Sequence, residues 1–524
     1  MSQAVLIQQN PVFPLEIFSL IVEIIAKSSP HYPSLGSDQL EKLAACSLTC
    51  SSLHELCRPQ IFRSISVGFN SRSGKKLLRL TGILNAKPII KTEIVDVFVS
   101  FLSSPRDRKL FEQLEKSAHH PATFPAVQRL SIVDGNTFTE GGRIQSRSPG
   151  PMPEFAQKFC RELIKSYAKL PTLRSFRNEY NLRAPDIPYI ALGCSTLQLT
   201  ELILVEIYDS DDPKPRSFKV APLKQLKRLT IEDCSTTFLH ILSQSTSISN
   251  LTIGGTFDEL RSLSIPRCKL ETLALYPDDR YEENGLSPAF NLLWKTNRSG
   301  FKPISTLRNL SVGVISPGDL LILDEMFADL GQLQSLTINA LSYYPKTLDW
   351  FSFSDIDGRR HIDKTFPFLT SINFLFWHQP TTTTLDSFAS LISTLGNAPH
   401  LERVKFTIST VIDKEENPFD DERLFPSLTT IVSSLLQYQA LLEVDIHLQF
   451  RRGSDLYYSS VLLDDIFLPG LRAKIQHLEQ ETGVALHASF SPSVCTTLSS
   501  WHRERVTHRS AYMVFYPKQF RLSS

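Results

Sequence analysis

Many short stretches of the chain place apolar residues at the first, fourth and sixth positions of a six-residue pattern, with short polar residues between them. The stretch 226–275 contains four such copies, which begin at Leu226, Ile248, Leu260 and Leu270. Alternating apolar and polar residues are typical of a strand with one buried face. Full copies exceed the roughly three expected by chance and begin at Phe62, Val127, Leu226, Ile248, Leu260, Leu307, Leu333, Leu369 and Leu401. Partial copies begin at Ile94, Leu173, Leu199, Leu270 and Leu441.

Helical segments are predicted between several of these strands. One has apolar residues at helical spacing from Phe155 to Tyr167, and another runs from Pro317 to Leu330 and ends at Gly331. Strand, turn, helix and turn in this order predict a leucine-rich-repeat solenoid, with parallel strands lining a concave surface. The predicted fold class is therefore α/β. The close spacing of Ile248, Leu260 and Leu270 leaves no room for a helix, so bare turns are expected there.

A small helical head is predicted at residues 11–67, before the repeats. Pro14 opens a helix whose apolar residues cover almost its whole circumference, and a second apolar set runs from Leu40 to Leu56. A segment this small cannot cover such a helix by itself. The head therefore needs a partner or a neighbouring domain.

Four segments of the head, in sequence order, resemble the F-box of the fungal F-box proteins with degenerate leucine-rich repeats. They are Pro14-Leu-Glu-Ile17, the aliphatic helix after it, residues 45–53 and residues 61–67. The resemblance implies a substrate receptor of an SCF-type ubiquitin ligase, in which the head binds the Skp-family adaptor, and through it a cullin, while the repeats bind a client protein. By the same resemblance the adaptor-binding residues are Pro14, Leu15, Ile17, Leu48 and Leu53. Phe13 and Leu53 depart from the Leu and Trp that are common in the family.

The residues alone allow a second interpretation of the head. A solenoid needs a cover over its terminal repeat, and a helical cap would supply one. The alternative function is therefore a leucine-rich-repeat scaffold that binds proteins and has no ligase role. The predicted domains are the head at 11–67, the solenoid at 68–450 and a C-terminal capping region at 451–524, with a helix over 461–480, a strand over 484–490 and a ragged tail.

Composition and charge narrow the partners and the compartment. The 55 basic and 54 acidic residues leave a net charge of +1, so bulk charge implies neither nucleic acid nor an anionic membrane. The first residues lack the basic segment of a signal peptide, and the chain contains no apolar run of about twenty residues. Its eight cysteines form no CxxC pair, which fits a reducing compartment. We expect a cytoplasmic or nuclear protein, or one found in both.

No catalytic motif was found. The chain lacks a phosphate-binding loop, a dinucleotide fingerprint, a nucleophile elbow and an H-E-x-x-H pair. His119 and His120 have no third ligand at a metal-binding spacing, and a surface turn is the favoured interpretation. We expect no enzyme activity, cofactor or metal; an enzyme with an unfamiliar site is a third, less favoured class.

Basic residues occupy several polar positions of the predicted strands, on the side expected to be concave. Clustered Arg side chains form charge-assisted bonds with carboxylates and phosphates. The hypothesis is that an acidic or phosphorylated client segment binds there; the alternative is that these residues only keep an open sheet soluble. The candidate client-binding residues are Arg129, Arg174, Lys227, Arg228, Arg261 and Arg308.

Overall fold

The computed structural model describes most of the repeat strands and the helical head. The described residues are 15–27, 37–68, 71–100, 123–133, 154–179, 190–193, 198–207, 223–234, 236–255, 268–277, 285–294, 303–314, 317–340, 366–376, 398–412, 440–452, 487–493 and 508–515, with isolated positions such as Leu260 and Leu435. They fall into two compact units. Unit 1 comprises Met1–Phe138 with Gln145–Gln225, and unit 2 comprises Thr139–Ile144 with Leu226–Ser524.

Unit 1 begins with three helices and continues with parallel strands. The strands β1 to β5 pair in sequence order, and Ser64, Asp96, Arg129, Ser175 and Glu201 form one row across them. The elements are α1 (Leu15–Lys27), α2 (Ser37–Ser47), α3 (Ser51–Phe62), β1 (Ser64–Gly68), α4 (Ser71–Ala86), η1 (Pro88–Thr92), β2 (Asp96–Ser100), β3 (Arg129–Val133), α6 (Glu154–Ala168), β4 (Ser175–Glu179) and β5 (Glu201–Val205).

Unit 2 continues the same repeat. Strands β6 to β13 are parallel and pair in sequence order. The elements are β6 (Arg228–Glu232), η5 (Thr236–Leu239), α8 (His240–Gln244), β7 (Asn250–Gly255), β8 (Thr272–Pro277), α9 (Ser287–Leu293), β9 (Asn309–Val314), α10 (Pro317–Phe327), β10 (Ser335–Ala340), β11 (Ser371–Phe376), β12 (Arg403–Ile412), β13 (Glu443–Arg452), β14 (His487–Ser493) and β15 (His508–Phe515).

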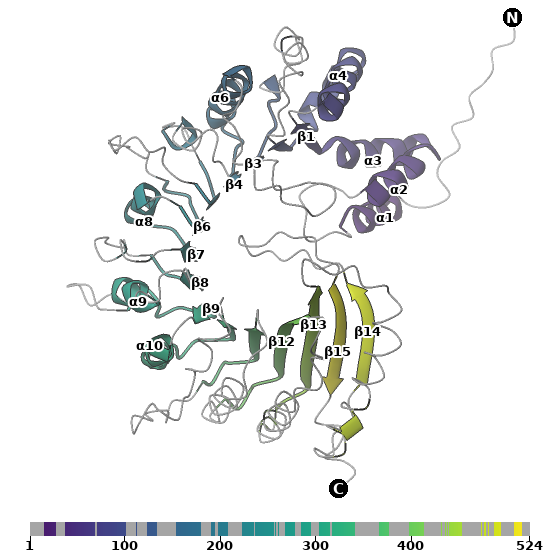
Figure 1. The fold of residues 1–524 in the computed structure, drawn as a ribbon. Helices are drawn as coiled ribbons and strands as arrows, with labels where there is room; N and C mark the ends of the chain where they lie inside the picture. The colour runs from purple at the N-terminus through teal and green to yellow at the C-terminus, as the bar shows by residue number, and fades with distance from the viewer. Residues whose placement is uncertain are drawn as a thin grey trace, which may run out of the picture. The chain divides into compact units, whose positions relative to one another are not determined.

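The two faces of these strands differ as the sequence pattern predicts. In β6, Leu229 and Ile231 are buried, whereas Arg228 is exposed and Thr230 is half-buried. Helices α8, α9 and α10 all lie on the same side of strands β6 to β9 (Figure 1). The buried aliphatic residues therefore form a core between the sheet and these helices, and the polar residues line the opposite face. The fold class is confirmed: an N-terminal helical segment precedes a leucine-rich-repeat array of parallel strands.

The predicted strand at Leu260 does not occupy a place in the ladder between β7 and β8, because these two strands pair directly; residues 261–267 lie outside the described residues. The Leu260 side chain is instead fully buried, and its N–H donates to the Phe257 carbonyl. Of the two neighbouring copies of the motif, the copy at Leu270 forms β8, the strand that pairs with β7. The preceding repeat has more room than expected, since η5 and the short helix α8 lie between β6 and β7.

The parallel array ends in an antiparallel pair. β15 lies between β13 and β14 and is antiparallel to both. The strand expected near 484–490 corresponds to β14, whereas β15 falls in the segment expected to be a ragged tail. Most of the helix predicted over 461–480 lies outside the described residues. The main division between the two compact units lies between Gln225 and Leu226. The predicted domain boundaries at 67 and 450 remain predictions.

Candidate partner-binding surfaces

The three helices of the head enclose a small core of their own. Val22 of α1, Leu43 of α2 and Cys57 of α3 are buried together. Ile25, Cys46, Leu53, Leu56 and Ile61 pack against them and are partly buried. Burial raises the pKa of the Cys57 thiol, so this cysteine serves as a neutral apolar side chain. The head is therefore a packed helical unit and more than an extension of the repeat.

One face of α1 is apolar and exposed. Ile17, Leu20, Ile21 and Ile24 occur at i, i+3, i+4 and i+7, the spacing of one helix face, and we call them the head stripe. Their exposed fractions are 43%, 58%, 42% and 61%. Val22, buried in the head core, and its partly buried neighbours Phe18 and Ile25 occupy a different face. Contiguous exposed aliphatic residues of this kind are characteristic of protein-binding surfaces.

The predicted adaptor-binding residues have different environments. Leu15 is 52% exposed at the start of α1, and Leu48 is 86% exposed just after α2. Ile17 belongs to the head stripe. Leu53 is half-buried and packs against the head core, so it supports the helices more than it offers surface. Pro14 lies outside the described residues.

Three residues of the head stripe were missed by sequence reasoning: Leu20, Ile21 and Ile24. Their spacing was visible in the sequence, but α1 is apolar on almost every side, so spacing alone could not separate core from surface. The packing of α2 and α3 against Val22 and Ile25 shows which side of α1 is core and leaves the head stripe as surface.

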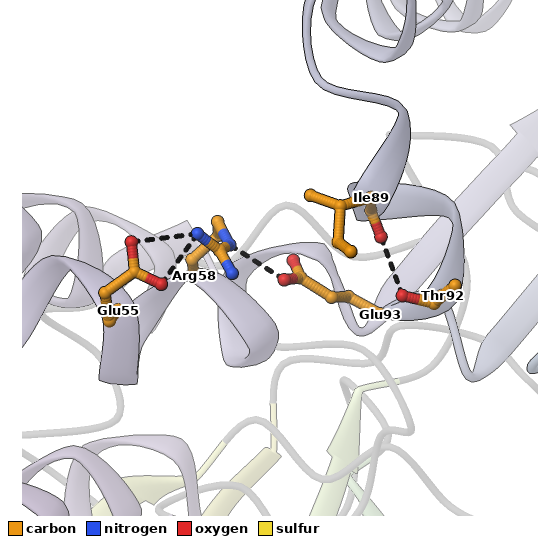
Figure 2. Close-up of polar contacts among 5 residues, drawn as sticks. All are labelled: Glu55, Arg58, Ile89, Thr92 and Glu93. Carbon is orange, nitrogen blue, oxygen red and sulfur yellow. Dashed lines mark hydrogen bonds and ion pairs between the residues drawn. The ribbon is translucent and has the colours of Figure 1, made fainter.

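The head also contacts the first repeat, through α3. β1 begins directly after α3, and Asp96 at the start of β2 donates its N–H to the Arg63 carbonyl at 2.9 Å. Arg58 of α3 donates from Nε to Glu93 Oε1 at 2.7 Å and also contacts Glu55 (Figure 2). The hydrogen bond to Glu93 raises the pKa of Arg58. Helix α3 thus covers the first repeat, while the head stripe on α1 is exposed.

In unit 1, the predicted client-binding residues already have partners within the chain. Arg129 holds both carboxylate oxygens of Asp96, at 2.5 and 2.6 Å, and this contact raises the pKa of Arg129. Arg174 donates to Gln198 Oε1 at 2.9 Å. Asp96 is almost fully buried, so Arg129 compensates a buried charge as well as lining the strand face.

In unit 2, the predicted basic residues do not form one cluster. Lys227 directly precedes β6, Arg228 is its first residue, and Arg308 lies just before β9, with β7 and β8 between them. Glu271 borders Arg308, because its carbonyl accepts the Arg308 N–H. Arg261 lies outside the described residues. An acidic client remains a prediction for these positions.

Between β6 and β12, Glu271 directly precedes β8 and Arg308 directly precedes β9, but the strands themselves present an uncharged face. The first, third and fifth residues of each of β7, β8, β9, β10 and β11 carry no charge, and we call this surface the neutral face. Charged residues return on both sides, as Arg228 and Glu232 on β6 and as Arg403 and Lys405 on β12. Lys405 pairs with Asp445 of β13 at 3.2 Å.

The comparisons with known proteins leave the family open. No protein-family model matches the chain, and no curated protein matches it. One solved structure with a related arrangement is the complex of Rad7 and Elc1 from yeast, with a TM-score of 0.28 and 12% sequence identity over 73% of this chain and 94% of that one.

The described residues contain neither a candidate metal site nor a candidate membrane-spanning helix. No group of three or more His, Cys, Asp or Glu side chains there could hold a metal ion. None of the helices in the described ranges is long and apolar enough to cross a membrane.

Proposed function

We propose that this protein is a substrate receptor of an SCF-type ubiquitin ligase and is not itself an enzyme. In this proposal the head binds the Skp-family adaptor, and through it a cullin, while the repeats hold a client protein. The ligase acts by proximity, because tethering raises the effective concentration of client lysines near the conjugating enzyme. The proposal rests on the head, where the F-box resemblance and an exposed apolar helix face coincide.

The single observation that supports it best is the head stripe. A helical cap needs to cover only the first repeat, and α3 does so through β1 and the Arg58–Glu93 pair. The cap interpretation therefore leaves the apolar face of α1 without a purpose. Burying an aliphatic side chain fully is worth about 1.5–3 kcal/mol, so covering four half-exposed ones would give a partner substantial affinity.

Binding of the full-length protein to a purified Skp-family adaptor, measured by calorimetry, tests the proposal. The wild type should bind, and Leu15→Asp combined with Ile17→Asp should abolish binding without lowering the unfolding temperature, since both side chains are exposed. A folded wild type that does not bind the adaptor would favour the alternative, a repeat scaffold whose head is only a cap.

A further inference from the structure

The helical head contains three of the eight cysteines of the chain, close together in sequence. Cys46 lies in the last turn of α2, Cys50 is the N-cap residue of α3, and Cys57 lies inside α3. Their accessibility falls in steps, because Cys50 is exposed, Cys46 is partly buried and Cys57 is buried in the head core. The head therefore has one thiol that a small solute can reach and a second thiol behind it.

The three thiols also lie near one another in space. Burial is the largest cause of the raised pKa of Cys57, and the thiols of Cys46 and Cys50 raise it further. Such an electrostatic effect requires proximity, because it weakens with distance. The backbone supplies a reason: the Thr49 N–H donates to the Cys46 carbonyl at 3.1 Å, which closes a turn directly before Cys50. Cys46 and Cys50 therefore flank one tight turn.

The surroundings of Cys50 suit an oxidised sulfur. The Leu53 N–H donates to Cys50 Sγ at 3.5 Å, at the positive end of α3. A thiolate or a sulfenate accepts such a hydrogen bond more strongly than a neutral thiol does. The partly buried Cys234 differs, because its Sγ donates to the Glu232 carbonyl at 3.2 Å, a contact that only a protonated thiol can make.

We infer that Cys46 and Cys50 are a peroxide-sensitive thiol pair, whose oxidation to a disulfide lowers the affinity of the head for its adaptor. The Cys50 thiolate attacks hydrogen peroxide, the O–O bond breaks, and hydroxide leaves as the sulfur becomes a sulfenic acid. The Cys46 thiolate then attacks this sulfur, the S–S bond forms, and the S–O bond breaks with loss of a second hydroxide. The protons that the two thiols release convert both hydroxides to water, so peroxide is reduced and the cysteines are oxidised.

The disulfide would change the turn that presents Leu48. This side chain lies between the two cysteines in sequence and is 86% exposed. Cys46 packs against the head core beside Cys57, so closing the bond draws its sulfur toward the start of α3 and shifts the turn. The effect on binding rests on the proposed function, since Leu48 is an adaptor contact only by the F-box resemblance. Formation of the disulfide needs no adaptor.

Mass spectrometry of the reduced full-length protein after treatment with hydrogen peroxide tests the first step. Cleavage after Glu residues yields the peptide 42–55, which contains Cys46 and Cys50 but not Cys57. This peptide should lose two hydrogens and regain them with dithiothreitol. Cys46→Ser should leave Cys50 as a sulfenic acid that dimedone traps. Cys50→Ser keeps a good N-cap residue and should abolish the reaction, whereas Cys234→Ser is the matched control and should react like the wild type.

Calorimetry with the purified adaptor tests the consequence. The oxidised wild type should bind about tenfold more weakly than the reduced protein, and peroxide should leave the affinity of Cys50→Ser unchanged. The inference is overturned if peptide 42–55 stays reduced, if its oxidation persists in Cys50→Ser, or if oxidised and reduced wild type bind equally. A reduced wild type that does not bind would remove the proposed function and the effect on binding together, while mass spectrometry still decides whether the disulfide forms.

Discussion

Arg58 Nε lies 2.7 Å from Glu93 Oε1, and this ion pair joins α3 of the head to the residue that follows η1 in the first repeat. The Glu93 side chain is only 11% exposed, and its second carboxylate oxygen is buried without a partner in the described structure. The ion pair therefore helps to hold the head on the first repeat, because the buried Glu93 carboxylate cannot exchange Arg58 for water.

Arg58→Ala should lower the free energy of unfolding by about 1–2 kcal/mol, because Glu93 would lose its charge-assisted hydrogen bond. Glu55, the other partner of Arg58, is 62% exposed and provides the matched control. Glu55→Ala should change stability by less than about 0.5 kcal/mol. Urea unfolding measures both, and equal effects would contradict the assigned role of Glu93.

Arg129 makes a separate prediction, because it compensates the buried Asp96. Arg129→Ala should destabilise the protein by about 2 kcal/mol, less than for a fully isolated buried charge because Arg63 Nε remains 3.6 Å from Asp96. Arg308→Ala, at an exposed position, should cost less than about 0.5 kcal/mol. Equal unfolding temperatures for the two variants would contradict the role of Arg129 as the partner of the buried Asp96.

Gly285 has no room for a side chain. A Cβ atom there would collide with the carboxylate of Asp319, which accepts the Leu286 N–H at 2.6 Å and is 1% exposed. Gly285→Ala should therefore cost at least about 2 kcal/mol. Gly82, inside α4, has open space around it, so Gly82→Ala should stabilise by up to about 1 kcal/mol. Chemical denaturation measures the free energy of unfolding, which should fall in Gly285→Ala and rise in Gly82→Ala.

Cys268 gives a pH dependence. Burial raises the pKa of its thiol from 9.0 to about 11. The folded state thus keeps a proton that the unfolded state loses, and stability falls as the pH rises from about 9 to 11, by up to about 2 kcal/mol. Cys268→Ala should reduce this fall, whereas Cys50→Ala, at an exposed thiol, should not. Urea unfolding at several alkaline pH values measures the slopes, and parallel curves for all three proteins would contradict the assignment.

The repeat strands could be predicted from sequence because each carries its signal within six residues. Val127, Leu307 and Leu401 each precede an observed strand by two residues. Leu260 carries the same signal, but β7 pairs directly with β8, because pairing between strands is a long-range property that no local pattern contains. β15 was missed for the same reason, since its neighbours are set by antiparallel pairing with distant segments.

The candidate surfaces were less predictable than the strands. The sequence identified α1 as a helix in need of cover, and Ile17 as one of its surface residues. It could not place Leu20 and Ile24 on the same exposed face, because that required the packing of α2 and α3. The basic residues were predicted to share one concave surface, but ladder pairing separates Arg228 from Arg308 by two uncharged strands.

Binding of a purified Skp-family adaptor to a matched pair of variants shows whether the head stripe is the adaptor-binding surface. Ile24 in the head stripe and Ile89 in η1 are both 61% exposed, so Asp at either position perturbs folding equally little. We expect Ile24→Asp to lose at least about tenfold in affinity, the equivalent of 1.4 kcal/mol of lost apolar contact, while Ile89→Asp binds like the wild type. Equal affinities for the two variants, or no adaptor binding by the folded wild type, would contradict it.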